Sequence, residues 1–190
     1  MMKRDDCFHV LKKHIADEIV VATYTSAHDW IAIAPRELNY FSTGAMGLAS
    51  SHALGLALGA PQRRVVVLDG DGSLCMNLGT LITIAAAAPR NFIHCVSHNG
   101  TYEANGAHPL PSRRIDFAGL ARAAGYRHAC TIAELADFEA QIGKLLTMDG
   151  PVFVELMVAP GKAYPIDYPN LYRADRREAL KAALRKTELG

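Results

Sequence analysis

The stretch Val65-Val66-Val67-Leu68-Asp69-Gly70-Asp71-Gly72-Ser73 decides the fold, because it joins an apolar run directly to an acidic, glycine-rich turn. An uninterrupted run of this kind is typical of a parallel strand that is buried on both faces. Glycine on either side of Asp71 lets the backbone come close to a ligand, and the free N–H groups of a following helix favour an anion. The stretch therefore predicts a strand, a ligand-binding turn and a helix.

A second polar turn, Asn99-Gly100-Thr101, follows the next apolar run along the chain. A helix over 73–88 and a strand over 91–96 would form the crossover that returns the chain to the same sheet edge. A carboxylate would repel a bare diphosphate, so Asp71 makes sense mainly if a divalent cation lies between them, and Mg²⁺ prefers oxygen ligands. A Gly-Asp-Gly turn alone is common, but its pairing with Asn99 at this spacing is much more specific. The two turns together predict a site for a metal ion and a diphosphate.

Composition narrows the function classes. The chain has 190 residues, half of them apolar, which is enough for one well-packed core and favours a single domain. Its formal charge is +1 and no dense Lys/Arg block occurs, so nucleic acid is not expected as a partner. The four cysteines form no Cys-x-x-Cys pair, and we expect buried, reduced thiols.

Membrane attachment is not expected either. The charged start Met-Met-Lys-Arg-Asp-Asp leads into no apolar signal-peptide core. The apolar run at 81–88 is too short to cross a bilayer. A cytoplasmic protein is the resulting expectation.

Helical and strand patterns alternate along the chain, which predicts an α/β protein with a doubly wound parallel sheet and its ligand at the carboxyl ends of the strands. A polar turn is expected at 23–26. The expected strands are 18–23, 40–42, 64–68, 91–96 and 152–158, and the expected helices are 5–16, 27–34, 47–58, 73–88, 116–124, 133–146 and 175–186.

Three separated segments match one family in order. They are Ser42-Thr43-Gly44-Ala45-Met46-Gly47, Gly70-Asp71-Gly72-Ser73 and Asn99-Gly100-Thr101, and together they resemble the diphosphate-binding domain of thiamine diphosphate-dependent decarboxylases. The flanking text Leu74-Cys75-Met76-Asn77-Leu78-Gly79-Thr80-Leu81 is most similar to the sulfopyruvate and phosphonopyruvate decarboxylase group. The resemblance covers roughly residues 5–160, and the order of the segments is harder to obtain by chance than any one motif.

The resemblance implies thiamine diphosphate and Mg²⁺ as cofactors. Asp71, the side chain of Asn99 and the carbonyl of Thr101 would hold the metal, while Gly72 and Ser73 would meet the diphosphate. The implied domain spans residues 1–161, and 162–190 would be a C-terminal extension with a short helix.

Two further segments are implied to serve the organic part of the cofactor. Gly44 would offer its carbonyl to the aminopyrimidine, and Met46 would be the bulky residue that bends the cofactor into its V shape. An ordinary core methionine is the alternative for Met46. Thr23 and Thr25 would line the aminopyrimidine side, although turn-forming roles fit them equally well. The full cofactor-binding set is Thr23, Thr25, Gly44, Met46, Gly70, Asp71, Gly72, Ser73, Asn99, Thr101 and Tyr102.

The chain departs from the family pattern at two places. His98 stands where the family often has a second amide, and we expect it to pack or hydrogen-bond, because imidazole is a poor ligand for Mg²⁺. Residues 102–109 replace the Gly-Gly-Gln-Pro-like sequence that is usual in the family. Loops there close over the substrate, so Tyr102, Glu103 and His108 are candidate contacts, with a solvated loop as the alternative. With Met46, Glu103 and His108 form the candidate catalytic set.

The length of the chain leaves no room for the pyrimidine-binding domain whose glutamate the family requires. The resemblance therefore implies the diphosphate-binding subunit of a two-component 2-oxo acid decarboxylase, with a separate pyrimidine-binding partner in a hetero-oligomer such as α2β2. Sulfopyruvate or phosphonopyruvate would need a cation near its distal anion, and an aromatic or aliphatic 2-oxo acid stays open. The cationic candidates are His28, Arg36, His108, Arg113 and Arg114.

Three alternatives remain. A 2-oxo acid oxidoreductase β subunit commonly brings cluster-ligating cysteines, which this chain lacks. A carboligase similar to acetolactate synthase uses the same domain. A non-catalytic thiamine diphosphate-binding subunit is disfavoured by the intact Asp71, Asn99 and Met46. For the helix at 175–186, the apolar Leu180 and Leu184 fit either a docked or a solvated position.

Overall fold

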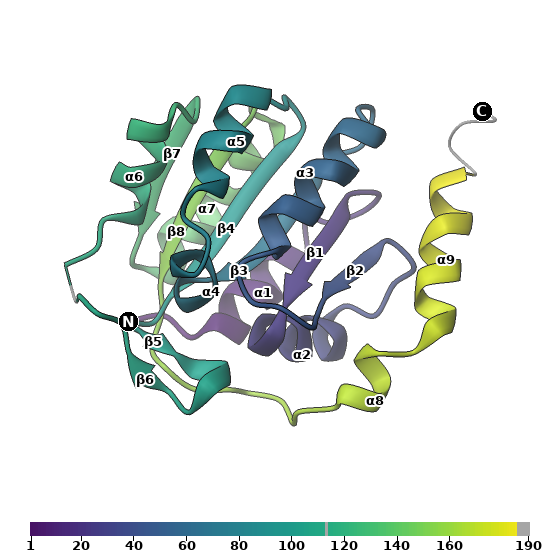
Figure 1. The fold of residues 1–190 in the computed structure, drawn as a ribbon, viewed down its shortest axis with the longest axis horizontal. Coiled ribbons are helices and arrows are strands. Elements are labelled where there is room, and N and C mark those ends of the chain that lie inside the picture. Colours follow the sequence, from purple (N-terminus) through teal and green to yellow (C-terminus); the bar gives the residue numbers. More distant parts are fainter. Residues whose placement is uncertain (113, 186–190) are drawn as a thin grey trace.

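A six-stranded parallel sheet forms the centre of the protein in the computed structural model, which describes residues 1–112 and 114–185 (Figure 1). The strand order is β2-β1-β3-β4-β8-β7, and every neighbouring pair is parallel. The strands are β1 (Ile19–Thr23), β2 (Asn39–Ser42), β3 (Val65–Gly70), β4 (Phe92–His98), β7 (His128–Ile132) and β8 (Val152–Met157). This arrangement confirms the doubly wound α/β sheet.

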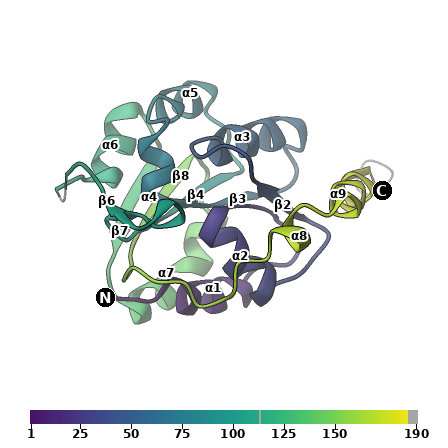
Figure 2. The ribbon, with the colours of Figure 1, turned by 60° about the horizontal axis from the view of Figure 1, so that its bottom comes forward.

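Helices cover both faces of the sheet, as Figure 2 shows. One face carries α1 (Arg4–Lys12), α2 (Tyr24–Ile33) and α7 (Leu135–Thr147), and the other carries α3 (Ala49–Gly59), α5 (Thr80–Ala87) and α6 (Phe117–Ala124). Strand side chains alternate between two cores: Val20 and Ala22 pack with Trp30 on the first face, whereas Ile19 and Val21 pack on the second. This alternation is why the strands read as continuous apolar runs.

The remaining elements are α4 (Asp71–Cys75), the antiparallel hairpin β5 (Thr101–Tyr102) and β6 (His108–Pro109), η1 (Glu103–Asn105), α8 (Tyr168–Leu171) and α9 (Ala174–Arg185). Of these elements, all but α9 are short.

The strand order reverses beside β1, because the chain passes from β1 to β2 on one side and then to β3 on the other. The carboxyl ends of β1, β3 and β4 therefore meet at one edge, at Thr23, Gly70 and His98. In open α/β sheets, ligands bind at such a switch point. The two polar turns predicted to form one site are both at this edge.

The long helix expected at 73–88 is wrong, because the structure has two helices there, α4 and α5. Asn77 and Gly79 lie between them, and both residues are weak helix formers. The side-chain amide of Asn77 donates a hydrogen bond to the carbonyl of Gly47 at 3.0 Å. The break therefore serves a contact with a distant loop that the local sequence pattern does not reveal.

Two other local predictions fail. The turn expected at 23–26 is the first turn of α2, which begins at Tyr24. The edge strand β7 was not expected, because only Ile132 of its five residues is fully buried and its sequence lacks an apolar run. A half-exposed edge strand carries a weaker hydrophobic pattern than a central one.

The C-terminal helix α9 packs against the edge strand β2 rather than standing in solvent. Leu180 is 6% exposed, Leu184 contacts the same core as α3, and the Arg176 guanidinium lies 5.9 Å from the centre of the Phe41 ring. The expected helix at 175–186 thus begins at Ala174, and residues 186–190 lie outside the described part of the chain.

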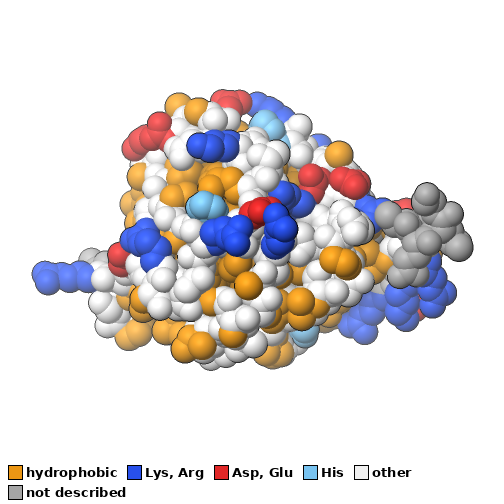
Figure 3. Space-filling model, turned by 90° about the horizontal axis from the view of Figure 1, so that it is seen from above, with side chains coloured by type: hydrophobic (Ala, Val, Ile, Leu, Met, Phe, Trp, Pro, Cys, Tyr) orange, Lys and Arg blue, Asp and Glu red, His pale blue; other side chains and the backbone are white. Residues whose placement is uncertain are grey.

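The face at the amino ends of the strands carries interspersed acidic and basic side chains (Figure 3). Asp149 pairs with Arg90 at 2.5 Å and with Arg127 at 3.4 Å, close to the starts of β8, β4 and β7. Within 1–112 and 114–185, none of the helices has the length and apolar character needed to cross a membrane.

Candidate functional site

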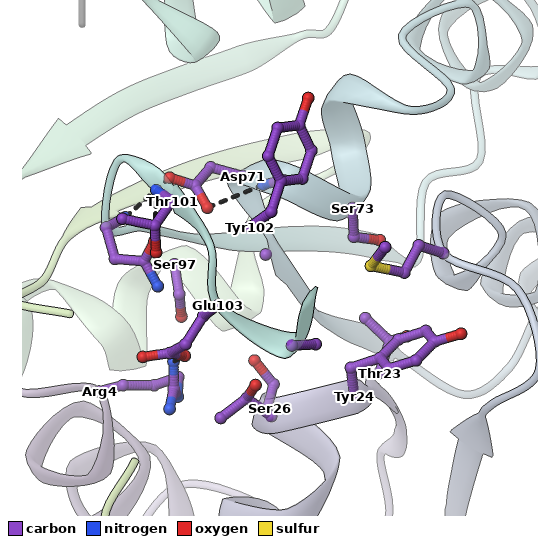
Figure 4. Close-up of a pocket in the computed structure, with 16 residues that line it drawn as sticks. Arg4, Thr23, Tyr24, Ser26, Asp71, Ser73, Ser97, Thr101, Tyr102 and Glu103 are labelled. Atoms are coloured by element: carbon purple, nitrogen blue, oxygen red, sulfur yellow. Dashed lines mark hydrogen bonds and ion pairs between the residues drawn. The ribbon is translucent and has the colours of Figure 1, made fainter. Parts of the chain in front are cut away.

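A pocket lies at the switch point, lined by the ends of β1, β3 and β4, the first turns of α2 and α4, and the loop after β4 (Figure 4). Most of the residues predicted from the sequence line this pocket. They are Thr23, Thr25, Met46, Gly70, Asp71, Gly72, Ser73, Asn99, Thr101, Tyr102 and Glu103. Gly44 and His108 do not line it, and His108 is exposed on β6.

Asp71 joins the two polar turns. Its Oδ2 accepts hydrogen bonds from the backbone N–H groups of Asn99 and Gly100 at 2.9 and 2.6 Å, and its Oδ1 accepts one from Gly72 at 2.8 Å. The carboxylate is 1% exposed. Burial raises the pKa of Asp71, and the three backbone N–H groups oppose that shift.

The loop after β4 presents oxygen atoms. Asn99 Oδ1 accepts hydrogen bonds from the N–H and the hydroxyl of Thr101 at 2.8 and 2.9 Å, which folds the loop on itself. Asp71, Asn99 and Thr101 line the same pocket, and the carbonyl oxygen of Thr101 would lie 3.3 Å from a Cβ at Gly72. A carboxylate, an amide oxygen and one backbone carbonyl thus lie in one small region. These are the ligand types that Mg²⁺ prefers, so the donor set fits that ion.

The glycines of the turn differ in their surroundings. A Cβ at Gly72 would lie 2.7 Å from Cδ1 and 3.2 Å from Cα of Tyr102, so the loop packs directly on the turn. A Cβ at Gly70 would meet nothing within 4 Å. The turn is therefore closed by Tyr102 at one glycine and open at the other, which leaves room for a ligand against the backbone.

The loop that carries Gly44 and Met46 is fastened to the α4 region through Gly47. The N–H of Gly47 donates to Ser73 Oγ at 3.0 Å, and its carbonyl accepts from Asn77 at the same distance. Because Ser73 Oγ acts as acceptor here, its own hydroxyl proton remains to be donated to a ligand. Met46 reaches the pocket from this loop.

The first turn of α2 also faces the pocket. Thr23 Oγ1 donates to the carbonyl of Ser42 at 2.8 Å, which ties the end of β1 to β2, and Tyr24 follows with φ of +44°. Among the described residues, no side chain caps the start of this helix, so its free N–H groups favour an anion in the pocket. Sequence reasoning placed Thr23 and Thr25 here but missed Tyr24 and Ser26.

His98 is hydrogen-bonded in the core, in line with the expectation from its chemistry. Its Nδ1 lies 2.7 Å from Glu155 Oε1, and its ring stands edge-on to Phe117 with the centroids 5.0 Å apart. The hydrogen bond to Glu155 raises the pKa of His98, against the effect of burial, and the nearby Asp71 raises it further.

Arg4 is a pocket residue that the sequence did not reveal. It is 4% exposed, and its guanidinium bonds Asp29 at 2.8 Å. It also bonds Glu103 at 2.5 Å, and Figure 4 shows these two side chains next to each other. Burial lowers the pKa of Arg4, but the two carboxylates outweigh this and raise it. From the sequence, a charged residue at the start of a helix is expected to be exposed to solvent. Arg4 is buried only because its partners, Asp29 and Glu103, come from distant segments of the chain.

The cationic candidates for a distal substrate anion that the structure describes are not among the residues that line the pocket; they are His28, Arg36, His108 and Arg114. His28 lies under the C-terminal extension, where its Nδ1 accepts from the N–H of Asp167 at 3.1 Å. Arg36 and Arg114 lie elsewhere, and Arg113 is outside the described residues. Among the pocket residues that the structure describes, Arg4 is the one with a permanent positive charge.

Comparison with known proteins agrees with this geometry. Residues 21–156 match the family described as "Thiamine pyrophosphate enzyme, C-terminal TPP binding domain". The chain is 37% identical over 166 residues to phosphonopyruvate decarboxylase of Streptomyces viridochromogenes, a match that covers 86% of this chain and 41% of that protein. It is also 37% identical over 164 residues to sulfopyruvate decarboxylase subunit beta of Methanothermobacter thermautotrophicus, covering 86% and 85%.

A solved structure shows the same fold. The thiamine diphosphate-dependent 4-hydroxybenzoylformate decarboxylase of Rhodococcus jostii superposes with a TM-score of 0.70 at 24% identity, over 85% of this chain and 33% of that one. The chain spans about two fifths of the length of the phosphonopyruvate decarboxylases that it matches. It belongs to the thiamine pyrophosphate enzyme family and carries that family's C-terminal cofactor-binding domain.

Proposed function

We propose that this chain is the diphosphate-binding subunit of a two-component, thiamine diphosphate-dependent 2-oxo acid decarboxylase. The observation that carries the proposal is the buried carboxylate of Asp71, which joins the Gly70–Ser73 turn to the Asn99–Thr101 loop. The relatives named phosphonopyruvate and sulfopyruvate decarboxylase support a substrate that bears a phosphonate or sulfonate.

Each part of the pocket has a role in this proposal. The side chains of Asp71 and Asn99 and the carbonyl of Thr101 hold Mg²⁺, and the Ser73 hydroxyl donates to the diphosphate. Met46 supports the organic rings from the loop held by Gly47. When bound, thiamine diphosphate supplies the electron sink that loss of CO₂ from a 2-oxo acid requires. The chain itself contributes orientation, charge placement and exclusion of water.

A second, pyrimidine-binding chain completes the site and supplies the catalytic glutamate in this proposal. Its support is the name "subunit beta" of a relative that the match covers over 85% of its length. A heteromer such as α2β2 follows from it. We place the enzyme in the cytoplasm, in line with its four free thiols, Cys7, Cys75, Cys95 and Cys130.

Calorimetric titration tests the cofactor site. Thiamine diphosphate is titrated into the chain with and without Mg²⁺, and into Asp71→Ala. We expect Mg²⁺-dependent binding that Asp71→Ala abolishes and that Asp116→Ala, at an exposed helix cap, retains. Absence of Mg²⁺-dependent binding, both alone and with a pyrimidine-binding chain present, would refute the site.

Release of CO₂ tests the reaction and the partner. Phosphonopyruvate, sulfopyruvate and pyruvate are each offered to the chain alone and to the chain with a candidate partner of similar length encoded next to it. Turnover is expected only with both chains. Full turnover by this chain alone would overturn the two-component proposal.

A further inference from the structure

A buried ionic cluster, of which Arg4 and Glu103 line the pocket, has no part in the roles proposed above. Arg4 donates from Nε to Asp29 Oδ2 at 2.8 Å, from Nη1 to Glu103 Oε2 at 2.5 Å, and from Nη2 to the carbonyl of Gly161 at 2.9 Å. The second oxygen of Glu103 accepts the N–H of Gly161 at 2.5 Å. The side chains of Arg4, Asp29 and Glu103 are 3%, 1% and 13% exposed. Both oxygens of Glu103 are therefore engaged within the protein.

The cluster joins segments that are far apart in the sequence. Arg4 begins α1, Glu103 begins η1, and Gly161 belongs to residues 159–167, which we call the strap because they run from β8 to α8 past the β5–β6 hairpin (Figure 1). The start of the chain and the strap are also paired through their backbones, since the N–H of Ala159 donates to the carbonyl of Met2 at 2.8 Å. Glu103 adds the loop after β4 to this pair.

That loop is the one that carries the proposed metal ligands. Tyr102, the residue before Glu103, packs on Gly72, and Asn99 and Gly100 donate to Asp71. A carboxylate fixed from two directions restricts the backbone next to it far more than a solvated side chain does. The position of the ligand-bearing loop thus depends also on the bonds that Glu103 makes to Arg4 and to Gly161.

We propose that Glu103 is a positioning residue, which locks the loop at 99–102 in its cofactor-binding conformation by tying it to Arg4 and the strap. This inference rests on the proposed function for the identity of the cofactor. Glu103 was a candidate catalytic residue by sequence, and the geometry assigns it this holding role instead. If the bonds of Glu103 to Arg4 and Gly161 are lost and the loop then adopts its cofactor-binding conformation one tenth of the time, the apparent affinity for the cofactor falls about tenfold.

The test compares Glu103→Gln with two matched variants. Asp29→Asn removes the other carboxylate on Arg4, from a residue of α2 that does not line the pocket. Glu139→Gln makes the same chemical change at an exposed ion pair with Lys13, at the far end of α1. The Kd for thiamine diphosphate at saturating Mg²⁺, the Tm, and the amide exchange of 99–102 and Gly161 are measured for the chain alone and with a pyrimidine-binding chain.

We expect Glu103→Gln to raise the Kd for thiamine diphosphate about tenfold or more and to speed amide exchange at 99–102 and Gly161. Asp29→Asn should lower the Tm but leave the Kd within about twofold of the wild-type value. Glu139→Gln should change neither. An unchanged Kd in Glu103→Gln, or an equal loss in Asp29→Asn, overturns the proposal. If Glu103→Gln does not fold, Glu103→Asp is judged by the same limits. If the wild type binds no cofactor, the proposed function fails, and the exchange data alone decide whether Glu103 holds the loop.

Discussion

Replacing Gly47 by alanine tests whether contact with the α4 region holds the loop that carries Met46. Gly47 has φ of +85°, and a Cβ there would lie 3.0 Å from the Cβ of Asn77 and 3.3 Å from that of Met76. Both neighbours are atoms fixed to the backbone, so neither can swing away. Left-handed backbone costs about 1–2 kcal/mol and overpacking about 1–3 kcal/mol, which together predict a loss of about 2–5 kcal/mol in the free energy of unfolding.

Alanine substitutions at two other glycines separate the cost of the left-handed backbone from the cost of overpacking. Gly44 has φ of +103° but nothing within 4 Å of an added Cβ, so Gly44→Ala should lose only the backbone part, about 1–2 kcal/mol. Gly55 lies in α3 with ordinary φ and open space, so Gly55→Ala should gain about 0.5–1 kcal/mol from reduced chain entropy.

Urea titration followed by circular dichroism gives all three values, provided that the slope of each transition matches that of the wild type. From the most to the least stable, we expect the order Gly55→Ala, wild type, Gly44→Ala and Gly47→Ala. A Gly47→Ala variant as stable as Gly44→Ala would refute the packing argument, because Gly47→Ala would then lose no more than the backbone strain that both variants share.

Three further predictions concern other parts of the chain. Leu180 is 6% exposed, so Leu180→Ala should lose about 2–3 kcal/mol in a urea titration, and a loss below about 0.5 kcal/mol would mean that α9 does not pack on β2. Burial raises the pKa of Cys95 to about 12 and, with the charge of Asp71, that of Cys75 to about 11. Because only the thiolate reacts, iodoacetamide at pH 8 should label both cysteines at least about a hundredfold more slowly in the folded protein than in the unfolded chain. The labelling rate of Cys75 should rise about tenfold per pH unit. Rapid labelling of either cysteine at pH 8, measured by mass spectrometry, would contradict this prediction. Thiamine diphosphate at about 100 times its Kd should stabilise the protein by about 2.7 kcal/mol with Mg²⁺, and stabilisation that survives chelation would argue against the metal.

The central strands and the two polar turns could be predicted because their determinants are local. Val65 to Leu68 are all buried, and the turn that follows contains Asp71, so one short stretch specifies both the strand and the site. The crossover rule then brings Asn99 to the same edge. The family resemblance added Met46, which lines the pocket, while its role beneath the cofactor stays a prediction.

What could not be predicted depends on contacts between distant residues. Arg4 and Glu103 are 99 positions apart, and Arg4 and Gly161 are 157 apart, so no local pattern relates them. The break between α4 and α5 has the same origin, because Asn77 leaves the helical pattern to bind Gly47. The edge strand β7 was missed for a different reason. Its side chains are mostly half-buried, and its sequence lacks the apolar pattern of the central strands.

The double attachment of Gly47 has a consequence for engineering the substrate range. Its N–H and carbonyl are bound to Ser73 and Asn77, and the first of these belongs to the helix that begins at Asp71. The loop that carries Met46 and the turn that carries Asp71 are therefore joined directly, so a shift of one is passed to the other. Libraries that vary Met46 should show strong epistasis with Ser73 and Asn77. Directed evolution should hold those two positions fixed while Tyr24 and Thr25, which line the pocket from the first turn of α2, are diversified.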